Sequence, residues 1–172
     1  MRSNQELFEA IFKWGQIKVS EEEIAALRER SEKREYLAEL CLILLDFSES
    51  KMHYNWFNGT VDELDKIQKE AFVKLEALGK HLPLAYKVAG DLYLGTMGKI
   101  VWHQDLALPF FEKYASATGD RSILDDFDSY ISKKWRDYND IQYYQQVQKV
   151  LKGRKSDDVG YSHDPLFYEN HD

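Results

Sequence analysis

The stretch that most constrains the fold is residues 84–120, where small and aromatic side chains recur at helical spacing. The small residues of its first half are Ala85, Ala89 and Gly90. A glycine-bearing connector follows, and Gly119 closes a second helical pattern. Small residues let helix backbones approach closely, so this stretch predicts two short helices packed together, the unit of a helical-repeat protein.

Apolar side chains also recur every three to four residues along most of the remaining chain. This spacing predicts helices over residues 4–14, 20–34, 35–47, 60–78, 84–94, 105–118, 122–134 and 138–151. Ser20 and Glu23 have the spacing of a capping box, and Asp105 is predicted to cap the helix that follows it. Three prolines and nine glycines in 172 residues are too few for an all-β protein. We therefore expect an all-α fold of about 7–8 helices, with antiparallel helix pairs stacked as a short α-solenoid or an irregular bundle.

The helical spacing of apolar residues ends near residue 152, so we predict two segments, a domain before this residue and a tail after it. Residues 1–152 are expected to form a helical domain with a core, since 44% of the chain is hydrophobic and 14% is aromatic. Residues 153–172 are polar and carry one short aromatic cluster, Phe167 and Tyr168. We expect this C-terminal tail to be either flexible or a strap that docks its aromatic side chains.

The formal net charge of −7 narrows the classes of partner. Nucleic acid and anionic membranes both require a basic surface, so neither is an expected partner. A basic protein is favoured, because opposite charges speed the encounter of two proteins. The alternative is that the acidic balance only maintains solubility.

Cysteine content and hydropathy indicate the cellular compartment in which this chain is expected. The single cysteine, Cys41, lies in the apolar run LCLILL and is expected to be a small buried core residue. The N-terminal residues lack the apolar core of a signal peptide. No stretch approaches the ~20 apolar residues that span a bilayer. A cytoplasmic location is therefore expected.

Aromatic side chains are concentrated in the predicted connector over residues 48–60. Tyr54, Trp56 and Phe57 lie there together with two asparagines. Tyrosine and tryptophan supply a large contact area at low entropic cost, so these three residues are candidate anchors for a protein partner. The alternative is that their rings fold back and cover the neighbouring helices.

Aspartates are concentrated near the start of the predicted helix over residues 122–134. Asp125, Asp126 and Asp128 lack the glycine and the distant glutamate of a calcium loop. We expect these acids either to complement the positive end of the helix dipole or to steer a basic partner.

The common catalytic and metal-binding motifs are missing from the sequence. None of the five histidines forms the i, i+4 pair of a helical metal site, and the chain has one cysteine. The phosphate-loop and serine-hydrolase motifs are absent. We therefore expect no enzyme activity, cofactor or metal. The alternative is an enzyme site formed only by tertiary contacts, around His103 and Asp105.

Residues 84–120 resemble a Sel1-like repeat, a relative of the tetratricopeptide repeat. The residues that match are Ala85, Ala89, Gly90 and Tyr93 in the first helix, and Ala107, Phe110, Phe111, Glu112, Lys113, Ala115 and Gly119 in and after the second. Ala89 stands where the family usually has leucine. The resemblance implies an α-solenoid that scaffolds protein–protein contacts without catalysis.

A second copy of this pattern can be aligned upstream. Tyr36 corresponds to Tyr86, and residues 71–75 correspond to residues 110–114. The number of residues that separates Tyr36 from Tyr86 is larger than the number that separates residues 71–75 from residues 110–114. This difference places an insertion in the aromatic connector over residues 48–60. Insertions in repeat proteins often lie on the binding face.

These features together predict a non-enzymatic protein-binding module. The specific hypothesis is an immunity or inhibitor protein that neutralises a basic toxin or nuclease domain. Its predicted binding residues are Tyr54, Trp56, Phe57, Asp125, Asp126 and Asp128. The alternative is a Sel1-like adaptor in a larger bacterial assembly, which would bind through exposed positions near Lys87 and Asp91.

Overall fold

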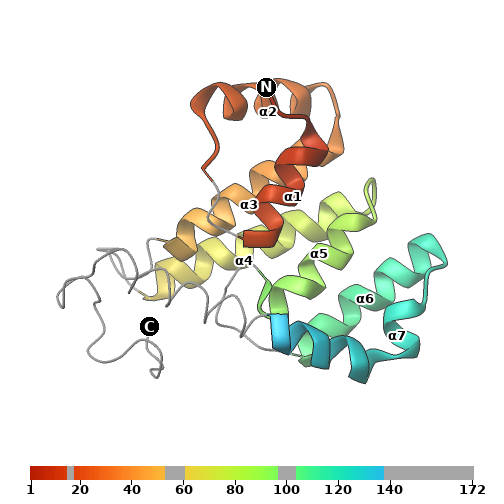
Figure 1. Ribbon diagram of the computed structural model, residues 1–172. Helices are drawn as coiled ribbons and strands as arrows, with labels where there is room; N and C mark the ends of the chain where they lie inside the picture. The colour runs from red at the N-terminus through yellow and green to blue at the C-terminus, as the bar shows by residue number, and fades with distance from the viewer. Residues whose placement is uncertain (15–17, 53–60, 97–103, 138–172) are drawn as a thin grey trace. The chain divides into compact units, whose positions relative to one another are not determined.

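The computed structural model describes residues 1–14, 18–52, 61–96 and 104–137, and these are helical almost throughout (Figure 1). They form eight helical segments and no β-strand, which confirms the all-α prediction. The chain divides into two compact units, residues 1–134 and residues 135–172. The second unit is described only over residues 135–137, so the predicted boundary near residue 152 and the predicted helix 138–151 lie outside the described residues.

The helices of the first unit follow one another with short connections. They are α1 (Asn4–Trp14), α2 (Glu21–Glu32), α3 (Tyr36–Met52), α4 (Val61–Gly79), α5 (Leu84–Tyr93), α6 (Gln104–Thr118) and α7 (Ser122–Asp125). A further helix covers residues 127–137. From α2 to α7 each helix packs against the next one in the chain, and α1 packs on α3.

The larger hydrophobic core lies between α1, α2, α3, α4 and α5. Leu7 and Ile11 of α1 and Leu27 of α2 are buried against the apolar side of α3. That side of α3 includes Leu40 and Leu44, each fully buried, because apolar residues recur there at three- and four-residue steps. Helix α4 adds Ala71, Leu75 and Leu78 to this core from the other side.

Close packing of α5 on α6 depends on the small residues of α5. A Cβ atom added at Gly90 would lie 2.6 Å from Cζ of Phe111 on α6. Ala85 and Ala89 are also fully buried. The prediction that small residues let these two helices approach is therefore confirmed. Gly119 then ends α6 with a φ of 79°, and its N–H donates to the carbonyl of Ala115 at 2.8 Å.

The predicted end of α3 and the predicted start of α6 are wrong. Helix α3 does not end at residue 47 but continues to Met52, because Glu49, Lys51 and Met52 are good helix formers. Helix α6 begins at Gln104, which places Asp105 inside the first turn and not at the N-cap. Pro109 lies within α6, where it removes one backbone N–H donor.

The predicted helix over residues 122–134 is broken near its start. Helix α7 ends at Asp125, and Asp126 has φ −138° and ψ 55°, outside the helical region. The next helix then begins at residue 127. The sequence pattern missed this break, because the apolar residues keep a helical spacing on both sides of it.

Candidate functional site

The predicted steering residues Asp125, Asp126 and Asp128 all lie on the surface. Each is exposed, and they flank the break between α7 and the helix over residues 127–137. Asp125 lies 3.6 Å from Nε of Arg121, but both side chains are more than half exposed, so this ion pair contributes little to stability. We call these three aspartates the acidic corner.

Asp120 lies in the turn that precedes α7 and the acidic corner. One carboxylate oxygen of Asp120 accepts hydrogen bonds from the hydroxyl of Ser122 at 2.7 Å and from the N–H of Ser122 at 3.0 Å. These bonds, the hydroxyl first, lower the pKa of Asp120 below its ordinary value. Asp120 therefore has a structural role in forming the turn between α6 and α7.

The predicted anchors Tyr54, Trp56 and Phe57 lie outside the described residues, and so does His103. Their assignments stay predictions. Near them in sequence, the described part of the chain holds one partly buried aromatic stack. Phe72 of α4 stacks on Tyr93 of α5 with ring centroids 4.1 Å apart, and Phe110 of α6 lies 6.1 Å from Tyr93. Burial raises the pKa of the Tyr93 hydroxyl.

A buried polar cluster, which the sequence did not reveal, surrounds Asp91 of α5. Asp91 is fully buried. Its Oδ1 accepts a 2.6 Å hydrogen bond from the Tyr130 hydroxyl and lies 3.5 Å from Nζ of Lys134, while Oδ2 lies 3.3 Å from Nζ of Lys87. Nζ of Lys134 also donates to Oγ1 of Thr96 at 3.3 Å. Two ammonium groups and one hydroxyl thus compensate the burial of one carboxylate.

The adaptor alternative, which concerns exposed positions near Lys87 and Asp91, stays a prediction. Asp91 has no exposed surface, and the Lys87 side chain is 30% exposed and is engaged by Asp91. A partner therefore does not reach Asp91 in this conformation.

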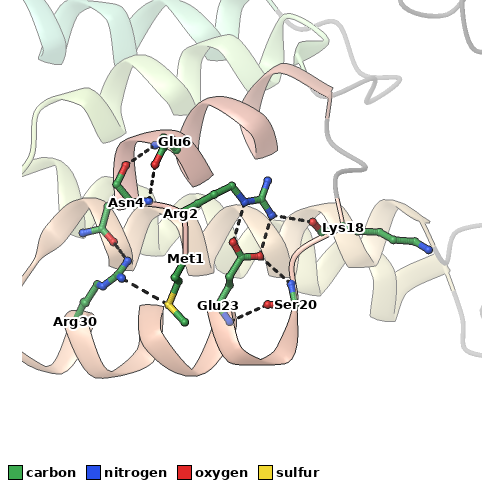
Figure 2. A network of polar contacts seen from close by, with 9 residues as sticks. Met1, Arg2, Asn4, Glu6, Lys18, Ser20, Glu23 and Arg30 are labelled. Atoms are coloured by element: carbon green, nitrogen blue, oxygen red, sulfur yellow. Dashed lines mark hydrogen bonds and ion pairs between the residues drawn. The ribbon is translucent and has the colours of Figure 1, made fainter.

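A second polar network fixes the N-terminus to α2 (Figure 2). The guanidinium of Arg2 donates from Nε and Nη2 to the two carboxylate oxygens of Glu23, each at 2.8 Å, and Nη2 also donates to the Lys18 carbonyl at 3.1 Å. Glu23 also completes the predicted capping box with Ser20, which is confirmed. The hydrogen bond from Arg2, and then that from the Ser20 N–H, lower the pKa of Glu23 to about 2. This network is structural, because every contact serves a helix end or the chain terminus.

The remaining reactive groups of the described residues offer no metal site. Residues 1–14, 18–52, 61–96 and 104–137 contain no group of three histidine, cysteine or acidic side chains placed to hold a metal ion. Cys41 is fully buried, as predicted, and its thiol lies 3.6 Å from the Asn4 carbonyl. Burial raises the pKa of Cys41 to about 12. In the same described ranges, no helix has the length and apolar character needed to cross a membrane.

Comparison of the chain with models of protein families, with curated proteins and with solved structures finds no match. The resemblance to the Sel1-like repeat therefore stays a prediction. Ala71 and Leu75 are buried, whereas Phe110 and Tyr114, the residues aligned with them in sequence, are partly buried.

Proposed function

We propose that this chain is a non-enzymatic protein-binding module for a basic protein, and that the partner is a toxin or nuclease domain which the chain neutralises. The observation that carries the proposal is the exposure of all three aspartates of the acidic corner. They project from a chain whose formal net charge is −7. Such a patch attracts a basic partner and orients it before contact.

The contrast with the buried acid strengthens this interpretation. Asp91 has a hydroxyl and an ammonium partner on Oδ1 and a second ammonium partner on Oδ2, and so its charge is compensated within the fold. The acidic corner has one exposed arginine beside it. Its charge is available to a partner, whereas the charge of Asp91 serves the packing of the chain.

Affinity is expected to come from a different set of residues. Exposed charges mainly accelerate association, while buried aromatic side chains slow dissociation. Tyr54, Trp56 and Phe57 are the proposed anchors, on the sequence argument alone.

The proposal is tested by affinity capture with three forms of the full chain. The first bait is the natural sequence, and the second is D125N/D126N/D128N, in which three carboxylates become neutral amides. The matched control is E32Q/E70Q/E112Q, which makes the same change of charge, from −7 to −4, at exposed positions on α2, α4 and α6. Quantitative mass spectrometry of the captured proteins is the readout.

We expect the natural chain and the control to enrich the same basic protein, and the acidic-corner variant to lose most of it. If both variants lost the basic protein equally, net charge alone would explain its binding. If the natural chain enriched no basic protein, the proposal would be wrong. A fourth bait, W56A/F57A, tests the anchors separately. Full recovery of the partner on that bait would show that Trp56 and Phe57 are not anchors.

A further inference from the structure

The helix over residues 127–137 places two side chains of one face on Asp91. Tyr130 and Lys134 are one helical turn apart, and both reach Oδ1 of that carboxylate. On the same side of the helix, the rings of Phe127 and Tyr130 lie edge-on to Phe111 of α6, with centroids 5.9 Å and 5.5 Å away. Residues 127–134 therefore cover a surface made by Asp91 of α5 and Phe111 of α6.

The covered surface has a defined chemistry. Asp91 is an acceptor that is fully buried beneath the cover, and Phe111 is an apolar ring that is 1% exposed. Without the cover, Asp91 would keep Lys87 of its own helix and lose the Tyr130 hydroxyl and the Lys134 ammonium. The surface therefore favours an occupant that supplies a hydroxyl, an ammonium group and an aromatic ring.

The cover has a helix break at one end and half-buried apolar side chains. It follows a four-residue helix, α7, and a non-helical residue, Asp126. Its apolar side chains Phe127, Tyr130 and Ile131 are half-buried and pack with the small cluster of Leu94, Ala107, Phe111 and Ile123. Nζ of Lys134 also lies 5.9 Å from the centroid of the Phe12 ring of α1. A segment that has few fully buried side chains and a break at one end can open locally while the rest of the fold persists.

We propose that residues 127–134 are an internal cover over a docking site on α5 and α6. The site takes a partner helix that carries a tyrosine and a lysine one turn apart, in the places of Tyr130 and Lys134. The chain's own segment occupies the site in the closed form, and a partner helix competes with it. This proposal stands on the Asp91 contacts and is independent of the acidic corner.

Opening of the cover is tested by hydrogen exchange and mass spectrometry on the full chain. Y130F removes one hydroxyl from Asp91, and K134M removes one ammonium group. Because each loses a bond to a charged acceptor, we expect the amides of residues 127–134 to exchange about 10- to 100-fold faster, with α3 unchanged. The control Y114F removes a hydroxyl from α6 and should leave residues 127–134 unchanged. Unchanged exchange in both variants, or an equal rise in α3, would overturn the proposal.

Occupancy of the site is tested with a synthetic peptide of residues 122–134. The peptide should bind the full-length Y130F chain about tenfold more tightly than the natural chain, because the open form is more populated. A second peptide, with Tyr130→Phe and Lys134→Met, should bind at least about tenfold more weakly than the first. Equal binding of the two peptides, or no binding of either to Y130F, would show that the covered surface is not a docking site.

Discussion

Gly90→Ala tests the packing of α5 against α6, two helices whose close approach depends on small residues. The added Cβ would lie 2.6 Å from Cζ and 2.7 Å from Cε1 of Phe111, well inside the contact distance of two carbons. The Phe111 ring has little room to move, because it is 1% exposed and lies edge-on to Phe127 and Tyr130.

The expected loss of stability follows from two opposing effects. Overpacking of a core costs about 1–3 kcal/mol, and the confined ring places this site near 3 kcal/mol. Alanine is favoured over glycine within a helix by about 1 kcal/mol. The free energy of unfolding should therefore fall by about 2 kcal/mol, which corresponds to a melting temperature about 4–8 °C lower.

The measurement is urea and thermal unfolding followed by circular dichroism, with two companion variants. Gly79→Ala brings a Cβ even closer to a ring, 2.4 Å from Cε1 of Tyr86, but Tyr86 is half-buried and can move, so a smaller loss is expected. G90A/F111L should be more stable than the sum of its single variants predicts, since the shorter side chain relieves the overlap. A G90A variant as stable as the natural chain, or more stable, would refute the reasoning.

Two further predictions concern titratable groups of the first unit. Glu23 has a pKa of about 2 in the folded chain against 4.5 for the ordinary group, so between these values the unfolded state binds more protons and stability falls as the pH falls. E23Q should flatten the pH dependence of unfolding in that window, whereas E22Q at the exposed neighbouring position should preserve it; an unchanged profile in E23Q would contradict this assignment. Cys41, with its pKa raised to about 12 by burial, should not react with a disulfide reagent at about pH 8 until urea unfolds the chain, and one thiol should then react; reaction of the native chain would show that the site opens.

Local patterns in the sequence were sufficient to predict most of the described helices and several of their ends. The apolar spacing on α3 predicts the buried side, and the capping box of Ser20 and Glu23 is present as expected. Ser3 and Glu6 have the same spacing and form the same pair of bonds: Ser3 Oγ accepts from the Glu6 N–H at 3.1 Å, and the Glu6 carboxylate accepts from the Ser3 N–H at 2.9 Å. Capping depends on residues three positions apart, which is why sequence alone can reveal it.

Contacts between distant parts of the chain were not predictable in the same way. Asp91 follows Gly90 in an apolar helix and resembles a surface residue in sequence, yet its partners Tyr130 and Lys134 come from a helix far along the chain. Arg2 likewise reaches Glu23 across α1. The exposure of Asp125, Asp126 and Asp128 agrees with a steering role but was equally expected from helix-dipole complementarity.

Steering by the acidic corner is tested most directly by the association rate constant of the captured basic partner at low salt. The natural chain, D125N/D126N/D128N and the control E32Q/E70Q/E112Q would be compared by stopped flow. We expect the acidic-corner variant to associate about tenfold more slowly and the control to stay within about twofold of the natural chain. Equal rate constants for the two variants would contradict a binding role for Asp125, Asp126 and Asp128.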